Sequence, residues 1–198
     1  MLRKTIYPKV ETYLKLAVKP LADGGVTPNQ ITIAGLVLNF VAGYLYATGN
    51  FMGGALMLLV AGMGDLLDGI LARETGQITK FGAFLDSSCD RYSDFFLFGG
   101  LALHYAYMDE ALYLVLTLGV IAGSFGVSYT KARAENLIDN CGVGIFDRAV
   151  RLIILFIGTF LPFLAPLALW TLFFGSNATA VHRILHTKKV LAGQPKPE

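Results

Sequence analysis

The apolar residues of this chain form six long stretches that are separated by short polar or glycine-containing breaks. The stretches cover residues of about 30–49, 53–75, 82–107, 110–133, 146–163 and 165–186. A helix needs about 20 apolar residues to cross the hydrocarbon core of a bilayer. The pattern therefore predicts an all-α integral membrane protein with six transmembrane helices. The division between the last two spans, from Pro162 to Pro166, can be drawn in more than one way.

The first 22 residues have a different pattern, in which apolar positions recur at helical spacing among Lys and Arg residues. This pattern is typical of an amphipathic helix in the headgroup plane of an anionic membrane. An ordinary surface helix is the alternative, but no soluble segment follows for it to pack on. Thr27-Pro28 then predicts an N-cap followed by proline at the first helical position. We expect an interfacial helix at 1–22, a six-span domain at 23–187 and a cytoplasmic tail at 188–198.

Composition supports a membrane protein. The chain is 55% hydrophobic and 15% charged, whereas about 25% of the residues in a soluble domain are charged. The net charge of +2 argues neither for nor against nucleic acid, and we expect no nucleic-acid partner. The two cysteines, Cys89 and Cys141, fit no zinc or redox spacing.

The distribution of cations orients the predicted spans. Lys and Arg occur in the first 22 residues, in the turn at 73–80, around 131–151 and from 183 onward. The turns near 50, 109 and 162 contain neither residue. Arg91 is the one remaining cation, and it lies beside Asp90 within the third predicted span. Because cytoplasmic loops are enriched in Lys and Arg, both termini are predicted to be cytoplasmic, in the plasma membrane.

Four aspartates lie within the apolar second and third stretches. Asp65 and Asp68 are three residues apart, and Asp86 and Asp90 are four apart, so each pair shares a helix face. A carboxylate at the centre of a spanning helix costs roughly 2.5–3.5 kcal/mol. A single intramembrane aspartate is equally compatible with a packing hydrogen bond or a proton relay. Four in register predict a site for Mg²⁺ or Mn²⁺, and two ions would fit, as in two-metal phosphoryl-transfer sites.

Other residues near these aspartates suit a phosphate ligand. Gly69 and Gly82 leave room for close helix approach or for a phosphate. Arg73 is one turn beyond Gly69 on the same face and is suited to a bidentate phosphate contact. Asp94 extends the aspartate stripe by four residues, and we expect it to support the site rather than to bind metal.

This segment resembles the CDP-alcohol phosphatidyltransferase family, whose signature D-x-x-D-G-x-x-A-R-x8-G-x3-D-x3-D is matched at every fixed position from Asp65 to Asp90. The resemblance implies a membrane enzyme that moves a phosphatidyl group from a CDP-linked lipid to an alcohol and releases CMP. It also implies that Asp65, Asp68 and Asp86 bind one metal ion. Asp90 would join a second ion and act as the general base.

The resemblance extends to the nucleotide end of the donor. Pro28-Asn29-x-x-Thr32 matches an element that lines the CDP pocket in the family. Asn29 or Thr32 would then bond the cytosine or the ribose. Asp68, Gly69 and Arg73 would lie near the diphosphate.

A basic cluster is the best clue to the acceptor alcohol. Lys131, Arg133, Arg148 and Arg151 would form a basic pocket that favours a phosphorylated acceptor, unless they serve only to orient the chain in the membrane. The Ser128–Glu135 segment resembles the S-Y-x-[KR]-A-R-A-E run of prokaryotic phosphatidylinositol-phosphate synthases. Residues 147–151 depart from the E-R-x-E-R element of that subgroup, whereas His182-Arg183 resembles its Q-R pair and adds Arg183 as a phosphate contact.

The acceptor predicted from this subgroup is inositol phosphate, followed by glycerol 3-phosphate and then serine, and the donor is CDP-diacylglycerol or a CDP-linked archaeal-type lipid. The family also implies a homodimer, formed along the third and fourth spans. Two other classes compete with this prediction. An ion or proton transporter would spread its charges through the bilayer depth, and an intramembrane prenyltransferase would carry N-D-x-x-D patterns, which are absent here.

Overall fold

The structure, a computed structural model, describes residues 18–193, and these residues contain helices and no strands. The elements are α2 (Pro28–Ala47), α3 (Phe51–Glu74), α4 (Lys80–Tyr107), α5 (Ala111–Ala134), α6 (Arg148–Phe160), the 3₁₀ turn η1 (Pro162–Leu164) and α7 (Ala165–Ala192). The prediction of an all-α protein is confirmed.

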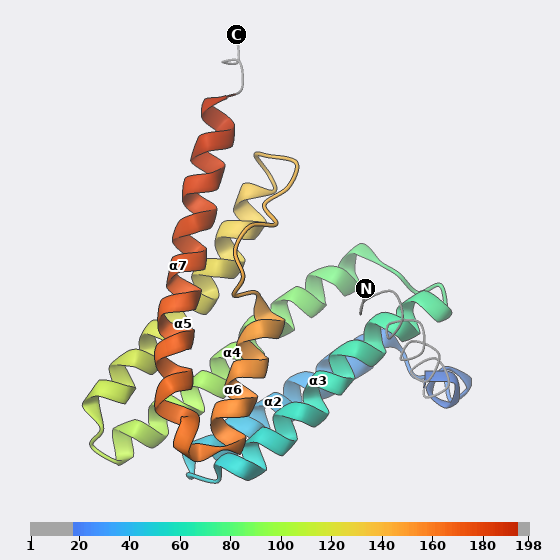
Figure 1. The fold of residues 1–198 in the computed structure, drawn as a ribbon. Coiled ribbons are helices and arrows are strands. Elements are labelled where there is room, and N and C mark those ends of the chain that lie inside the picture. The colour runs from blue at the N-terminus through green and yellow to red at the C-terminus, as the bar shows by residue number, and fades with distance from the viewer. Residues whose placement is uncertain (1–17, 194–198) are drawn as a thin grey trace, which may run out of the picture.

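Helices that follow each other in the chain run in opposite directions, and the helices spread apart toward one end of the bundle (Figure 1). α2 packs along α3 and α4, α5 packs along α4 and α7, and α6 contacts α3 and α7. The turns α2–α3, α4–α5 and α6–α7 lie together at the narrow end, whereas the α3–α4 turn and the α5–α6 loop lie at the spread end. The main core includes Tyr46, Phe98, Leu155 and Leu172, and it joins these helices.

Two glycines allow α2 and α4 to cross at close range. A Cβ on Gly43 would collide with the backbone of Phe96, and a Cβ on Gly100 would collide with the backbone of Gly43. Small residues at a helix interface let backbones approach in this way. The crossing fixes α4 against α2, and both helices continue from it to the spread end.

The breaks between helices follow local sequence signals. Thr27 caps α2 through a capping box with Gln30, and Pro28 is the first helical residue, as predicted. The α3–α4 turn contains Gly76 at φ 68°, a left-handed conformation that glycine adopts without strain. Thr79 then caps α4 by accepting a hydrogen bond from the backbone N–H of Gly82 at 2.9 Å. The turn makes α3 and α4 antiparallel neighbours.

Four segments of the described part are long and apolar enough to cross a bilayer, namely α2, α3, α5 and Pro162–Ala192. α4 is long enough, but its first half carries Asp86, Asp90, Arg91 and Asp94. The predicted fifth span, 146–163, is wrong in its bounds, because α6 has only 13 residues. It rises about 20 Å, less than the roughly 30 Å of a hydrocarbon core. The protein is a multi-pass membrane protein, and six spans stay a prediction.

The predicted interfacial helix at 1–22 lies largely outside the described residues. Its described end, residues 18–23, is helical. Val18 is buried against Ile70 and Leu71 of α3. The segment that precedes α2 is therefore packed against the last turns of the helix that carries Asp65 and Asp68.

Candidate active site

The four signature aspartates lie on facing helices in the spread half of the bundle. Asp65 and Asp68 belong to the second half of α3, and Asp86 and Asp90 to the first half of α4. The Gly76 turn brings these segments together, so the carboxylates are close enough to repel one another. Four like charges in a half-buried cleft require cations to offset the repulsion and the desolvation.

Arg148, the first residue of α6, supplies one of these cations. Its Nη1 lies 2.5 Å from Asp65 Oδ2 and also forms an ion pair with Asp90 Oδ1. Its Nε lies 3.6 Å from Asp94 Oδ1. Arg91 adds a second cation, with Nη2 3.3 Å from Asp90 Oδ2. The carboxylates of α3 and α4 are thus bridged by a side chain from α6.

Within residues 18–193, no three His, Cys, Asp or Glu side chains are grouped as a ready-made metal site. The convergence of Asp65, Asp68, Asp86 and Asp90 on one metal site stays a prediction. In this structure Asp65 and Asp90 meet at one nitrogen of Arg148. The donor set still fits a hard divalent cation, because it consists of carboxylate oxygens without thiol or imidazole.

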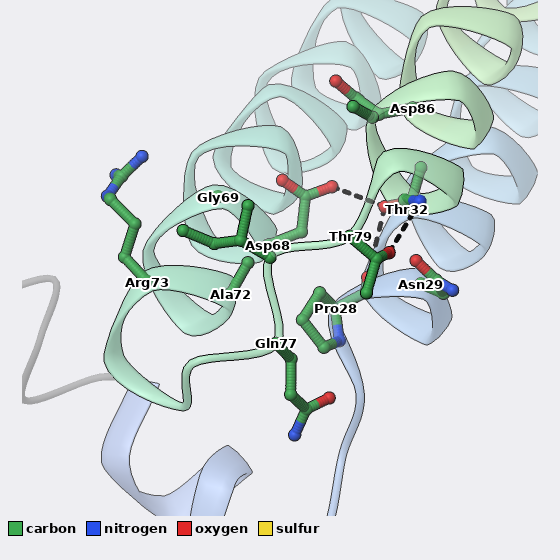
Figure 2. Close-up of a pocket in the computed structure, with 13 residues that line it drawn as sticks. Pro28, Asn29, Thr32, Asp68, Gly69, Ala72, Arg73, Gln77, Thr79 and Asp86 are labelled. Carbon is green, nitrogen blue, oxygen red and sulfur yellow. Dashed lines mark hydrogen bonds between the residues drawn. The ribbon is translucent and has the colours of Figure 1, made fainter.

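A pocket of about 270 Å³ opens between the start of α2, the end of α3 and the start of α4 (Figure 2). All five residues predicted to bind CDP line this pocket, namely Asn29, Thr32, Asp68, Gly69 and Arg73. The residues predicted to bind CDP thus come from two helices, α2 and α3, and they do lie around one cavity.

Hydrogen bonds and close contacts shape the walls of this pocket. Thr32 Oγ1 donates to Asp68 Oδ2 at 2.7 Å, so α2 and α3 are tied at the pocket floor. The guanidinium of Arg73 lies over Gly69, where a Cβ would be 3.7 Å from Nη1. A Cβ on Gly82 would lie 3.3 Å from Asn29 Oδ1, so this glycine keeps α4 close to the start of α2.

Sequence reasoning missed the part of the pocket wall formed by the α3–α4 turn. Gln77, Ile78 and Thr79 line the cavity together with the signature residues. The available signal was the unusual shortness of the Gly76-Gln77 break, which forces the turn to lie beside both helix ends. The polar groups of Gln77 and Thr79 add hydrogen-bonding capacity to the pocket.

The residues predicted to bind the acceptor divide into three groups. Lys131 and Arg133 are exposed at the end of α5, where Lys131 Nζ lies 3.9 Å from Glu135. Arg148 lies at the carboxylates. Arg151 and Arg183 are buried, and their guanidiniums are already bonded within the protein. An acceptor could not contact Arg151 in this conformation, because its side chain has no exposed surface.

Arg183 supports the loop between α5 and α6. Its Nε donates to the carbonyl of Val143 at 2.9 Å, and its Nη1 donates to the carbonyl of Val127 at 2.6 Å. The predicted phosphate contact of Arg183 therefore competes with two backbone hydrogen bonds. In this structure its guanidinium stabilises the loop that leads to Arg148.

Asp94 joins α4, α5 and α6 beneath the carboxylate cluster, in agreement with the supporting role expected for it. It is buried and accepts a hydrogen bond from Ser124 at 2.5 Å and one from Arg151 at 2.6 Å. Arg151 also donates to the carbonyl of Phe146 at 3.0 Å. This network fixes the first turn of α6 and so the backbone from which Arg148 projects.

We predict that Asp94→Asn lowers the thermal stability of the purified protein in detergent. Removing one partner of a buried ion pair costs about 3–5 kcal/mol, because the other charge stays buried, and here that charge belongs to Arg151. Ser124→Ala is the matched control, since it removes one hydrogen bond and is expected to cost about 1 kcal/mol. Equal melting temperatures for the wild type and Asp94→Asn would contradict this account of the network.

Comparison with known proteins agrees with the site. A family model described as CDP-alcohol phosphatidyltransferase matches residues 25–182. An archaetidylinositol phosphate synthase of Pyrococcus horikoshii is 37% identical, with 94% of this chain and 96% of that protein covered. A phosphatidylinositol phosphate synthase of Mycobacterium marinum is 40% identical, with 83% of this chain and 76% of that protein covered.

Solved structures agree as well. The crystal structure of Mycobacterium tuberculosis phosphatidylinositol phosphate synthase with CDP-DAG bound superposes with a TM-score of 0.86 at 31% identity, covering 93% of this chain and 98% of that one. The same enzyme in complex with manganese and citrate gives a TM-score of 0.84 at 33% identity, covering 93% of each chain. The chain therefore belongs to the CDP-alcohol phosphatidyltransferase family, and it is a membrane transferase of phospholipid biosynthesis.

Proposed function

We propose that the protein transfers a phosphatidyl group from CDP-diacylglycerol, or from a CDP-linked archaeal-type lipid, to inositol phosphate and releases CMP. The observation that carries this proposal is the position of the pocket around Asn29 and Arg73. It shares Asp68 and Asp86 with the carboxylate cluster, and the cluster in turn contacts the basic side chain of Arg148. The donor nucleotide, the reacting phosphate and the phosphorylated acceptor would thus bind at adjoining sites.

The nucleotide would occupy the pocket between α2, α3 and α4. Asn29 and Thr32 offer hydrogen-bonding groups for the cytosine or the ribose. Gly69 leaves room for a diphosphate, and the guanidinium of Arg73 above it can pair with two phosphate oxygens. The lipid chains would extend into the bilayer, and the apolar groove of about 240 Å³ between α3 and α6 starts near Leu66, beside Asp65.

The signature aspartates would hold the divalent metal. Asp65, Asp68 and Asp86 would hold one ion, Asp90 would join a second, and Mg²⁺ and Mn²⁺ both suit these oxygen donors. Bound ions would neutralise charge on the diphosphate and on the transferring phosphoryl group. The manganese complex of the Mycobacterium tuberculosis enzyme supports the use of a divalent metal.

Asp90 would act as the general base. Its carboxylate takes the proton of the acceptor hydroxyl, whose oxygen forms a bond to the lipid-linked phosphorus. The bond from this phosphorus to the CMP oxygen breaks, and CMP leaves. Arg91 contacts Asp90 Oδ2 at 3.3 Å, so this contact can orient the carboxylate before the substrate arrives. Positioning and charge neutralisation would supply most of the rate.

The acceptor phosphate would bind among the cations at the spread end. Lys131 and Arg133 are the accessible members of the predicted set, and Arg148 is adjacent to Asp90. Arg151 and Arg183 would contribute by fixing the backbone that carries the other cations.

We predict that Lys131→Ala and Arg133→Ala each raise the KM for inositol phosphate about tenfold while changing the KM for the CDP-lipid less than about twofold. The physical reason is that each variant loses a charge-assisted contact to the acceptor phosphate alone. Steady-state CMP release at varied acceptor and varied donor concentrations measures both constants. Lys189→Ala, in the last turn of α7, is the matched control, because no acceptor contact is assigned to this lysine. Equal changes in the two KM values would remove these residues from the acceptor pocket.

The same proposal includes the arrangement in the membrane. An interfacial helix at 1–22, a six-span domain at 23–187 and a cytoplasmic tail at 188–198 would place both termini and the active site at the cytoplasmic face of the plasma membrane. α4 would cross despite its aspartates, because these face the cleft shared with α3. A homodimer would form along α4 and α5, where apolar side chains such as Phe95, Leu103 and Leu118 are exposed.

CMP release by the purified protein in detergent tests the function. The assay contains CDP-diacylglycerol, Mg²⁺ or Mn²⁺, and one acceptor at a time from inositol 1-phosphate, glycerol 3-phosphate, serine and inositol. Release with inositol 1-phosphate alone is the expected result. Release with glycerol 3-phosphate or serine would keep the reaction and change the acceptor. No release with any acceptor, in protein that does not bind CDP, would favour an ion transporter.

A further inference from the structure

A single nitrogen of Arg148 bridges carboxylates from two helices. Nη1 contacts Asp65 Oδ2 on α3 at 2.5 Å and also pairs with Asp90 Oδ1 on α4. A cation shared by these two oxygens would have to lie between them, and that position is filled by the guanidinium. Carboxylates that bind Mg²⁺ directly lie about 2.0–2.1 Å from the ion. The Arg148 contact therefore excludes a metal ion from the space between Asp65, a ligand proposed for the first ion, and Asp90, a ligand proposed for the second.

The contacts of the Arg148 side chain permit it to move away from the carboxylates. All its recorded contacts are to the carboxylates of Asp65, Asp90 and Asp94, and its buried Nε has no hydrogen-bond partner. Its side chain is 17% exposed. Arg151, one turn later, is 0% exposed and bonds both Asp94 and a backbone carbonyl. The second arginine thus anchors α6, while the first can rotate without disturbing that anchor.

We propose that Arg148 and a divalent cation compete for Asp65 and Asp90, and that the guanidinium, once released, becomes a ligand for the acceptor phosphate. The first half follows from the shared oxygens. The second half rests on the proposed function and on the place of Arg148 at the start of α6, next to the loop that follows Lys131 and Arg133. The metal ion and the phosphorylated acceptor then favour each other's binding. The metal ion displaces Arg148 from the aspartates and frees it for the acceptor phosphate, and the acceptor phosphate draws Arg148 away from the aspartates and frees them for the metal ion.

Mn²⁺ binding to the full-length protein in detergent tests the competition without turnover. The electron paramagnetic resonance signal of free Mn²⁺ gives the dissociation constant in the absence of any CDP-lipid. We expect Arg148→Met to bind Mn²⁺ about tenfold more tightly than the wild type, within the usual range of coupling between sites. Arg91→Met is the matched control. It also removes a cation from Asp90 but no contact to Asp65, and its affinity should change less than about threefold.

Three results would overturn the competition: an unchanged affinity in Arg148→Met, a weaker affinity, or equal gains in both variants. Arg148→Lys keeps a charge at this position and provides a second test if Arg148→Met does not fold. We expect its Mn²⁺ affinity to lie between those of the wild type and Arg148→Met. An affinity for Arg148→Lys below that of the wild type would count against the proposal.

A second titration tests the link to the acceptor. With inositol 1-phosphate present, the wild type should bind Mn²⁺ about fivefold more tightly, and Arg148→Met should show no such gain. A protein-free titration corrects for Mn²⁺ that the phosphate binds in solution. The absence of a gain in the wild type would overturn the acceptor half. The first titration contains no substrate. Its result therefore tests the competition between Arg148 and the metal ion separately from the proposed reaction.

Discussion

Asp90→Asn is expected to reduce CMP release about a thousandfold or more while binding of CDP is retained. The amide cannot take the proton of the acceptor hydroxyl, and general-base catalysis alone contributes about 10²–10⁴. Asp90 does not line the pocket around Asn29 and Arg73, so the nucleotide keeps its contacts. Single-turnover release of CMP and isothermal titration with CDP measure the two effects separately.

Asp109→Asn is the control for this experiment. Asp109 is exposed in the α4–α5 turn at the narrow end of the bundle, with φ 55°, a conformation that Asn tolerates. This variant should keep wild-type turnover. Turnover near the wild-type rate in Asp90→Asn would remove Asp90 as the base. Loss of CDP binding in that variant would instead assign Asp90 to the nucleotide pocket.

Removal of divalent metal by a chelator is expected to lower turnover to the uncatalysed background. Without a metal ion, no cation would lie between the aspartate carboxylates and the diphosphate, and these like charges repel strongly in a cleft of low dielectric. Mg²⁺ or Mn²⁺ should restore activity when added in excess over the chelator. Steady-state CMP release measures the recovery.

Ca²⁺ provides the control for metal identity. It prefers six to eight oxygen ligands at about 2.3–2.6 Å, whereas Mg²⁺ requires about 2.0–2.1 Å. We therefore expect poor recovery with Ca²⁺ at concentrations where Mg²⁺ restores full turnover. Undiminished activity in the chelator, with no residual bound metal, would contradict a metal-dependent reaction.

Much of the donor side of the site could be predicted from sequence because its parts are local. The spacing of Asp65, Asp68 and Gly69 sets one helix face, and the short Gly76 turn brings the next helix beside it. The capping box at Thr27 starts α2 at the right residue, so Asn29 and Thr32 face the same cavity. Periodicity, capping and a tight turn were sufficient to assemble the pocket.

The acceptor side could not be predicted in the same way. Arg148 pairs with Asp65, which lies 83 positions earlier in the chain, and periodicity says nothing about such contacts. The sequence shows that Arg148, Arg151 and Arg183 are cations near one face of the membrane. It does not show which guanidiniums are buried, because that depends on how α6 and α7 pack.

The apolar pattern also could not predict the length of α6. Residues 161–164 are as apolar as the helices on either side, so hydropathy does not mark the break. The helix ends because Leu161 leaves helical geometry, with φ −115° and ψ 84°, and Pro162 has no backbone N–H to continue the hydrogen-bond ladder.

The glycine crossing of α2 and α4 has a mechanical consequence for the rest of the molecule. Gly43 and Gly100 put two backbones in contact, and Asn39 of α2 donates a hydrogen bond to Ser93 of α4 at 3.2 Å, about 10 Å farther along the helix. Because α2 and α4 are joined at both places, a change in the tilt of α2 would carry Asp86 and Asp90 with it. Bilayer thickness, which bears on the tilt of spanning helices, would thereby be coupled to the distances between the aspartates of α3 and those of α4.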